Sequence, residues 1–150
     1  MRSIILLSVL AACGGDPGVD APVNCADETR AEPFVVGVDK AAVGGMLDFK
    51  MITATPAPPA RYQNSWTVLV SAMNNNVVGA PMPGAAIQVS PWMPDHQHGN
   101  GIPVTVTEMA GGMYTFDPLY LGMPGYWEIT LDVDAGGTMD KVVYKICISP

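Results

Sequence analysis

Both histidines of the chain, His96 and His98, lie within one three-residue segment. In an extended segment, the side chains of residues i and i+2 point to the same side of the backbone, with their Cα atoms about 6.5 Å apart. Two imidazoles at this spacing can bind one metal ion at nitrogen–metal distances of about 2.0–2.1 Å. Asp95, directly before the pair, adds a carboxylate that suits Cu(II) or zinc. The segment therefore predicts a metal site in which two imidazoles share an ion.

Thioether groups accompany the histidines. The chain contains three Met-Pro pairs, Met82-Pro83, Met93-Pro94 and Met123-Pro124. A following proline favours an extended conformation for each methionine, which can present its sulfur outward from a loop. Imidazole and thioether ligands favour copper, especially Cu(I), over magnesium, calcium or manganese. The alternative is that the histidines only hydrogen-bond neighbouring carbonyls and that the methionines fill the core.

The elements that must position these residues are short strands. Apolar and polar residues alternate with a period of two in seven runs, which are separated by turns rich in Gly, Pro and Asn. The runs lie at residues 47–51, 66–70, 87–89, 104–106, 114–116, 127–133 and 142–148. This pattern predicts an all-β fold, an immunoglobulin-like antiparallel β-sandwich, with a small closed barrel as the alternative. Tyr114, which follows two glycines, is expected to be a core anchor and fits a corner tyrosine whose hydroxyl bonds to nearby backbone.

The first residues predict an export signal. Arg2 precedes an apolar run from Ile4 to Ala12, which is about half the length that a membrane-spanning helix needs. The run ends in Leu10-Ala11-Ala12-Cys13-Gly14, which resembles the lipobox of bacterial lipoproteins, where the acylated cysteine becomes the first residue. An ordinary signal peptide with an incidental cysteine is the alternative.

The lipobox resemblance also implies a location and a domain organisation. Aspartate directly after the lipidated cysteine retains such proteins at the inner membrane, whereas Gly14 occupies that position here. We therefore expect a protein of the cell envelope, anchored by lipid at the outer membrane and facing the periplasm. We expect a signal peptide over residues 1–12, a lipidated tether over 13–33 and a β-sandwich domain over 34–150.

Cys25 and Cys147 remain when Cys13 carries lipid. Two thiols in an oxidising envelope generally form a disulfide, which would join the N-terminal segment to the last strand. Such a bridge would close most of the chain into one loop and contribute roughly 4–5 kcal/mol. A cysteine metal site is disfavoured, because these cysteines are isolated rather than paired at close spacing.

Composition and motifs exclude several functional classes. The 150-residue chain has a net charge of −7, and its seven basic residues are scattered, which disfavours nucleic-acid binding and purely electrostatic adhesion to an acidic membrane. The sequence contains no nucleophile elbow, phosphate-binding loop or HExxH pair. Because both histidines lie together, no separate general base remains. We therefore expect a protein that is not an enzyme.

Several motifs occur in an order that resembles the YtkA-like domain, a family related to the FixH proteins and often carried by bacterial envelope lipoproteins. The residues that carry this resemblance are Trp66–Val70, Gly84–Val89, Met93–Gly99, Gly112–Tyr114 and Met123–Ile129. The most specific parts are the Met-Pro-x-His-x-His-Gly loop and the Met-x-Gly-x-Trp turn. The resemblance covers about residues 46–148 and implies a small immunoglobulin-like sandwich with a connection to copper handling and respiratory oxidase assembly.

The resemblance implies four copper ligands, Met93, His96 and His98 from one loop and Met123 from another. Loops that are distant in sequence gather at the same end of a sandwich, so the two loops can share a rim. We expect a lipid-anchored envelope protein that binds or delivers copper, with a copper-dependent oxidase assembly factor or another envelope protein as its partner. The alternative is an envelope protein-protein interaction module that binds no metal and whose histidines are structural.

Overall fold

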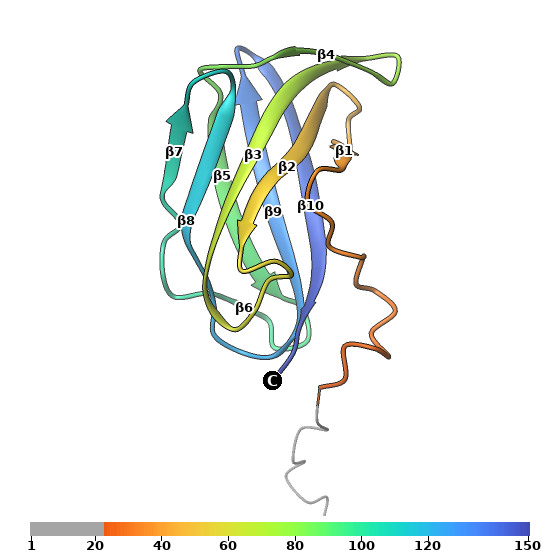
Figure 1. The fold of residues 1–150 in the computed structure, drawn as a ribbon, viewed down its shortest axis with the longest axis vertical. Coiled ribbons are helices and arrows are strands. Elements are labelled where there is room, and N and C mark those ends of the chain that lie inside the picture. The colour runs from red at the N-terminus through yellow and green to blue at the C-terminus, as the bar shows by residue number, and fades with distance from the viewer. Residues whose placement is uncertain (1–22) are drawn as a thin grey trace, which may run out of the picture.

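The computed structural model describes residues 23–150, so the expected signal peptide and Cys13 lie outside the described residues. The described chain forms two antiparallel sheets that pack face to face as a sandwich (Figure 1). Within this range, there is no helix with the length and apolar character that crossing a membrane requires. The all-β sandwich prediction is confirmed.

Ten strands make up the two sheets. The first sheet consists of β1 (Asp39–Ala41), β2 (Leu47–Thr55), β3 (Tyr62–Asn74), β4 (Val77–Pro81), β7 (Val106–Met109) and β8 (Met113–Leu121); its order is β1-β2-β3-β8-β7, and β4 also pairs with β3. The second sheet consists of β5 (Ala86–Met93), β6 (His98–Gly99), β9 (Gly125–Ala135) and β10 (Thr138–Ile148), in the order β10-β9-β5-β6.

Seven of these strands contain or overlap the seven alternating runs, and β1, β4 and β6 are additional. β1 and β6 have three and two residues, which are too few to display a period of two. All five residues of β4 are exposed, so this strand has no alternation between buried and exposed positions. The sequence therefore does not reveal strands that pair with a neighbour through the backbone without burying one of their two faces.

The alternating runs form the core. Trp127, Ile129 and Leu131 of β9 point inward with at most 1% of each side chain exposed, and they pack with Phe49 of β2 and Trp66 of β3. Complete burial of an aliphatic or aromatic side chain stabilises a fold by about 1.5–3 kcal/mol. Burial of these residues fixes which face of each strand points inward. Because side chains alternate along a strand, it also fixes the directions of the side chains near the strand ends.

Tyr114 fastens the connection between β4 and β5. Its hydroxyl donates a hydrogen bond to the carbonyl of Met82 and accepts one from the amide of Ala85, both at 2.8 Å. The hydroxyl bonds to backbone as expected, but its partners lie 29 and 32 residues upstream and not nearby in the chain, so Tyr114 does not form a tyrosine corner. Met82, in the first Met-Pro pair, is half-buried and packs against the core instead of standing free on a loop.

Residues 23–33, which the sequence analysis assigns to a tether, pack on the sandwich. Cys25 forms a disulfide with Cys147, with their Cα atoms 5.5 Å apart, as the cysteine count suggests. The amide of Glu32 donates to the carbonyl of Lys145 at 2.8 Å. Cys147 lies on the outward face of β10, in the phase that the alternation predicts. The expected tether over 13–33 therefore does not hold for these residues, and residues 13–22 lie outside the described part of the chain.

Asp140 joins the start of β10 to the turn between β1 and β2. Its carboxylate accepts hydrogen bonds from the amides of Gly44, Met46 and Leu47 at 2.7, 2.9 and 3.3 Å, and from its neighbour Lys141. Partial burial alone would raise the pKa of Asp140, but the four backbone donors outweigh it and hold the pKa below its ordinary value. The carboxylate thus links the two sheets at this end.

We expect Asp140→Asn to lower the free energy of unfolding by about 1–2 kcal/mol at neutral pH, because an amide has one acceptor oxygen where the carboxylate has two. The folded-state pKa is lowered, so the contribution is complete above the unfolded-state pKa of about 4 and is lost as pH falls through the folded-state pKa. Urea unfolding of both proteins at several pH values measures this difference. Asp132→Asn, at an exposed position, is the control. A difference in free energy of unfolding between the parent and Asp140→Asn that stays constant down to pH 2 would contradict this role of the Asp140 carboxylate.

Candidate metal site

The β5–β6 hairpin carries both histidines at one end of the sandwich, His96 in the turn and His98 at the start of β6 (Figure 1). The amide of Gln97 donates to the carbonyl of Met93 at 2.8 Å, and Gln97 has a positive φ of 55°. The backbone between His96 and His98 is therefore a tight turn, not the extended segment that their spacing suggested. Both histidines are exposed.

The turn still brings the two imidazoles together. The ring centroids of His96 and His98 are 5.8 Å apart, and the ring planes are inclined by 51°. An ion bound about 2.0–2.1 Å from a ring nitrogen lies about 3 Å from the centroid of that ring. The separation of the two rings therefore allows them to share one ion.

The tautomer of His98 follows from its hydrogen bond. Nδ1 of His98 lies 2.8 Å from the carbonyl oxygen of Gly99, which can only accept, so Nδ1 carries the proton. The lone pair is therefore on Nε2, the nitrogen that is free to bind an ion. A hydrogen bond from the other ring nitrogen to a carbonyl is the usual way in which proteins orient a histidine ligand.

Trp127 connects the histidine loop to the turn that contains Met123. The ring of His98 lies 6.5 Å from the indole of Trp127, nearly perpendicular to it at 80°. Nε1 of Trp127 donates to the carbonyl of Met123 at 3.0 Å, and 37% of Met123 is exposed. The two loops thus lie at the same end of the sandwich, with one indole in contact with both.

Met93 does not lie where the sequence analysis expects it. It is the last residue of β5 and is completely buried, whereas the preceding Trp92 is 43% exposed. The expectation that Pro94 presents the Met93 sulfur outward is wrong, because the alternation of β5 continues through its last residue and directs Met93 into the core. Its methyl group lies only 3.0 Å from where a Cβ on Gly125 would be, and Gly125 has a positive φ of 128°. Met93 therefore packs in the core between the histidine loop, which follows it, and Gly125, which follows the Met123 turn.

Asp95 is occupied by an ion pair. The guanidinium of Arg30 donates to both of its carboxylate oxygens, each at 2.7 Å, and also binds Glu28. The hydrogen bond from Arg30 holds the pKa of Asp95 below its ordinary value. The carboxylate therefore positions the histidine loop and is not a free ligand.

Arg30 also contacts the second loop. Its guanidinium lies over the ring of Tyr126, 4.2 Å from the centroid, and Tyr126 follows Gly125 at the start of β9. One side chain from the disulfide-bonded N-terminal segment thus joins the neighbour of His96 to the turn that follows Met123. Sequence reasoning missed Arg30, because no local pattern relates it to Asp95, 65 positions away.

The donor set limits which ions the site suits. Within residues 23–150, no three His, Cys, Asp or Glu side chains are grouped so that they could hold an ion. A site made only from carboxylates, imidazoles and thiolates is therefore not formed in this part of the chain. The remaining candidates are the two imidazoles and the thioether of Met123, from a turn at the same end of the sandwich, a set that suits copper better than calcium or magnesium.

Comparison with known proteins identifies the family. The profile of the YtkA-like family matches residues 47–132, which is more than half of the chain. The match extends from the start of β2 into β9 and includes both the histidine loop and the Met123 turn. Searches of curated proteins and of solved structures gave no match. The chain belongs to the YtkA-like family.

Proposed function

We propose that this protein binds or delivers a copper ion in the cell envelope, with His96, His98 and Met123 as its ligands. The observation that carries the proposal is the paired imidazoles, 5.8 Å apart, one of which has its Nε2 lone pair free. The Met123 turn lies at the same end and supplies a soft ligand. Met93, which the resemblance implicates as a fourth ligand, is enclosed by the core and holds both loops in place.

The exposure of the site suits transfer of the ion between proteins. His96, His98 and Met123 are all exposed, so a partner can approach the ion directly. The partner would be a copper-dependent oxidase assembly factor or another envelope protein. The protein would be held by lipid on Cys13 at the outer membrane and face the periplasm. The Cys25–Cys147 disulfide supports an oxidising compartment. The proposed role is binding and transfer, not catalysis.

A second candidate function is docking to an envelope protein without metal. Trp92 is 43% exposed and Met123 is 37% exposed at the same end as the histidines. Exposed tryptophan and methionine are enriched in protein interfaces. In this case the hydrogen bond of His98 would serve only to hold the loop.

A metal titration distinguishes the two candidates. Under anaerobic conditions, the chain with its disulfide intact should withdraw one equivalent of Cu(I) from a coloured chelator, and the NMR signals of both imidazoles should shift together. Uptake that leaves both imidazoles unchanged, or no uptake at all, would contradict the copper proposal. A stoichiometric envelope partner that remains bound after chelation would instead favour the docking function.

A further inference from the structure

The end of the sandwich opposite the histidine loop exposes an unusual amount of apolar surface. We call this surface the apolar end and define it by Val43, Met46, Val77, Val78 and Met139, which are 72%, 45%, 67%, 46% and 71% exposed. These residues lie on the β1–β2, β3–β4 and β9–β10 hairpins, which gather at the end where Figure 1 shows β4. Scattered apolar residues are normal on a protein surface, whereas a group on adjacent hairpins indicates an interaction site.

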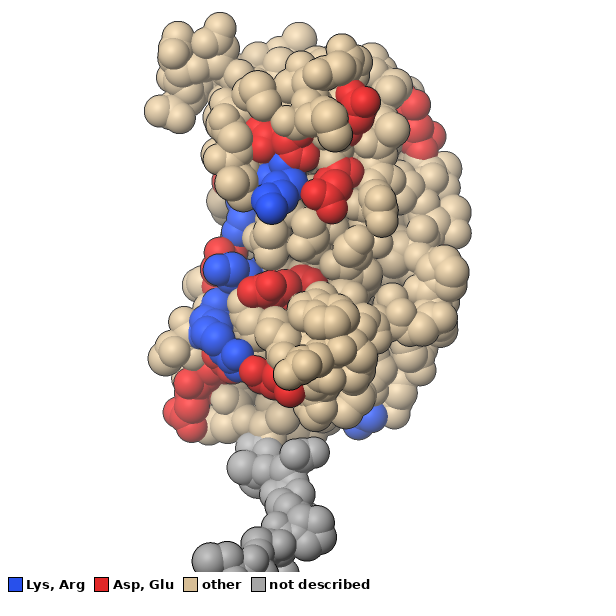
Figure 2. Space-filling view, turned by 180° about the vertical axis from the view of Figure 1, so that it is seen from behind, with Lys and Arg blue, Asp and Glu red and all other residues tan. Residues whose placement is uncertain are grey.

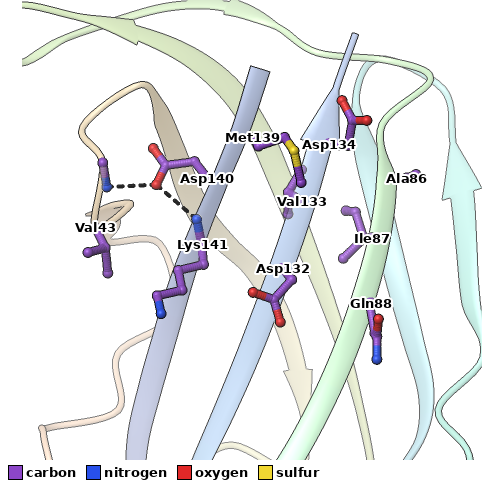
Figure 3. Close-up of a pocket in the computed structure, with 11 residues that line it drawn as sticks. Val43, Ala86, Ile87, Gln88, Asp132, Val133, Asp134, Met139, Asp140 and Lys141 are labelled. Atoms are coloured by element: carbon purple, nitrogen blue, oxygen red, sulfur yellow. Dashed lines mark hydrogen bonds between the residues drawn. The ribbon is translucent and has the colours of Figure 1, made fainter. Parts of the chain in front are cut away.

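Hydrogen bonds hold the three hairpins together. The amide of Met73, beside the β3–β4 turn, donates to the carbonyl of Met46 at 2.8 Å. On the other side, Asp140 of β10 accepts from the amides of Gly44 and Met46. Figure 3 shows Asp140 beside the turn that contains Val43, with its bond to the amide of Lys141. The apolar end is therefore built as one surface, and it does not consist of independent loop tips.

A hollow of about 580 Å³ opens beside this surface, across β5, β9 and β10 (Figure 3). Val43, Ile87 and Met139 supply apolar walls, and Asp132 and Asp134 lie along the same side of β9. The hollow is broad and open to solvent, unlike an enclosed ligand pocket. It can hold a few side chains of a bound segment.

Three carboxylates, of Asp132, Asp134 and Asp140, and one cation, Lys141, line the hollow, so its net charge favours a cation. Asp132 lies directly opposite Lys141 in the β9–β10 register, yet the two form no ion pair within the described part of the chain. Asp134 accepts one hydrogen bond from the amide of Gly137, which leaves its second oxygen free of protein hydrogen bonds in the described chain. A carboxylate beside an apolar wall suits an apolar segment that carries a basic side chain.

Two other occupants fit less well. A second copy of the chain in a twofold contact through this hollow would place Asp132 and Asp134 of both copies in one interface, and like charges oppose such contact. The chain also has few cations to offer, because Arg30, Lys40 and Lys50 are already in ion pairs. Figure 2 views the molecule from behind the view of Figure 1. On the face that it shows, the lysine and arginine side chains lie mainly along one side, among acidic residues. An anionic lipid surface would be repelled by the same carboxylates.

We propose that the apolar end and its hollow dock a short apolar segment of another protein, with an arginine or lysine of that segment beside Asp132. Val43, Ile87 and Met139 would contact its apolar side chains. This surface lies at the opposite end from the histidine loop, so the protein can hold a partner without covering the candidate metal ligands.

The test uses two nine-residue peptides that alternate valine and serine, one with a central arginine and one with citrulline in its place. Titration into the isotopically labelled full chain should shift backbone NMR signals around residues 86–88, 132–134 and 139–141. The arginine peptide should bind about threefold to fivefold more tightly, as expected for one exposed charge pair. No binding at 1 mM, equal affinities, or shifts confined to other residues would overturn the proposal.

Three variants locate the contacts. Asp132→Asn should abolish the preference for arginine, and Met139→Lys should weaken both peptides about tenfold. Met109→Lys is the matched control, at an apolar position on β7 that is 47% exposed, and it should bind both peptides as tightly as the parent does. Unchanged binding by Met139→Lys would overturn the proposal. Dimerisation that Met139→Lys abolishes would also overturn it and assign the surface to a second copy, and displacement of the peptide by phosphatidylglycerol vesicles would assign it to lipid.

Discussion

Replacing both Cys25 and Cys147 with serine is expected to lower the free energy of unfolding by about 4–5 kcal/mol. The bridge spans 122 residues, so its loss restores a large amount of conformational freedom to the unfolded chain. Such a change is a large fraction of the stability of a typical domain, about 5–15 kcal/mol. Urea unfolding of the oxidised parent and of the double variant, at the same pH, measures the difference.

Cys13→Ser is the matched control, because it removes a cysteine and leaves the bridge intact. Its unfolding midpoint should equal that of the parent. If the double variant also unfolded at the parent's urea concentration, the disulfide would contribute no stability and the prediction would be wrong.

The same double variant should also loosen the histidine loop. Arg30 lies between the disulfide and β1, and it holds Asp95, the neighbour of His96. Without the bridge, the segment that carries Arg30 is anchored to β10 by the bond from Glu32 to Lys145. Faster hydrogen exchange of the Gln97 amide would show this coupling, and unchanged exchange would show that the loop holds its own conformation.

The second large effect concerns the imidazoles. We expect His96→Ala combined with His98→Ala to reduce Cu(I) affinity by at least about 100-fold, because changing a residue that only supports a ligand already costs about 10- to 100-fold. Each single variant should retain weaker binding. His98→Ala should have the larger effect, since the bond from Nδ1 to Gly99 orients its free nitrogen in advance. Competition with a chelator of known affinity measures each value.

Two further variants control this comparison. Thr107→Ala, at an exposed position on β7, should leave copper affinity unchanged. Met123→Leu keeps a similar side-chain volume and removes the sulfur, so it should weaken Cu(I) more than zinc. The copper proposal would be wrong if the double histidine variant bound Cu(I) as tightly as the parent.

The sandwich was predictable because burial of one strand face is a local property of the sequence. The inward residues of β9, Trp127, Ile129 and Leu131, alternate with polar residues, and this period is visible without any knowledge of their partners. The burial of Tyr114 was predictable for the same reason, whereas its hydrogen bonds to Met82 and Ala85 were not, because those residues lie far away in the chain. The cysteine count likewise suggested the bridge between Cys25 and Cys147.

The candidate site was only partly predictable. The sequence identified His96 and His98 from their spacing, but the tight turn at Gln97, with its positive φ, brings the rings together by another route. The interpretation of Met93 is wrong because the alternation of β5 directs this side chain inward, whatever extended conformation the following proline favours. Met93 is buried against Gly125, because a thioether is apolar enough to pack in the core, and this burial outweighs exposure of the sulfur on a loop.

The sequence by itself determined the seven strands that alternate apolar and polar residues, which face of each is buried and which side chains can bind a soft metal. Only the tertiary structure decided that residues 23–33 pack on the sandwich, that Arg30 joins Asp95 to Tyr126, and that the apolar end forms one surface. The physical reason is the range of the interactions. Alternation relates residues two positions apart and is visible in the local sequence. Ion pairs, stacking and the assembly of hairpins join residues far apart in the chain, and the sequence around each residue does not indicate its partner.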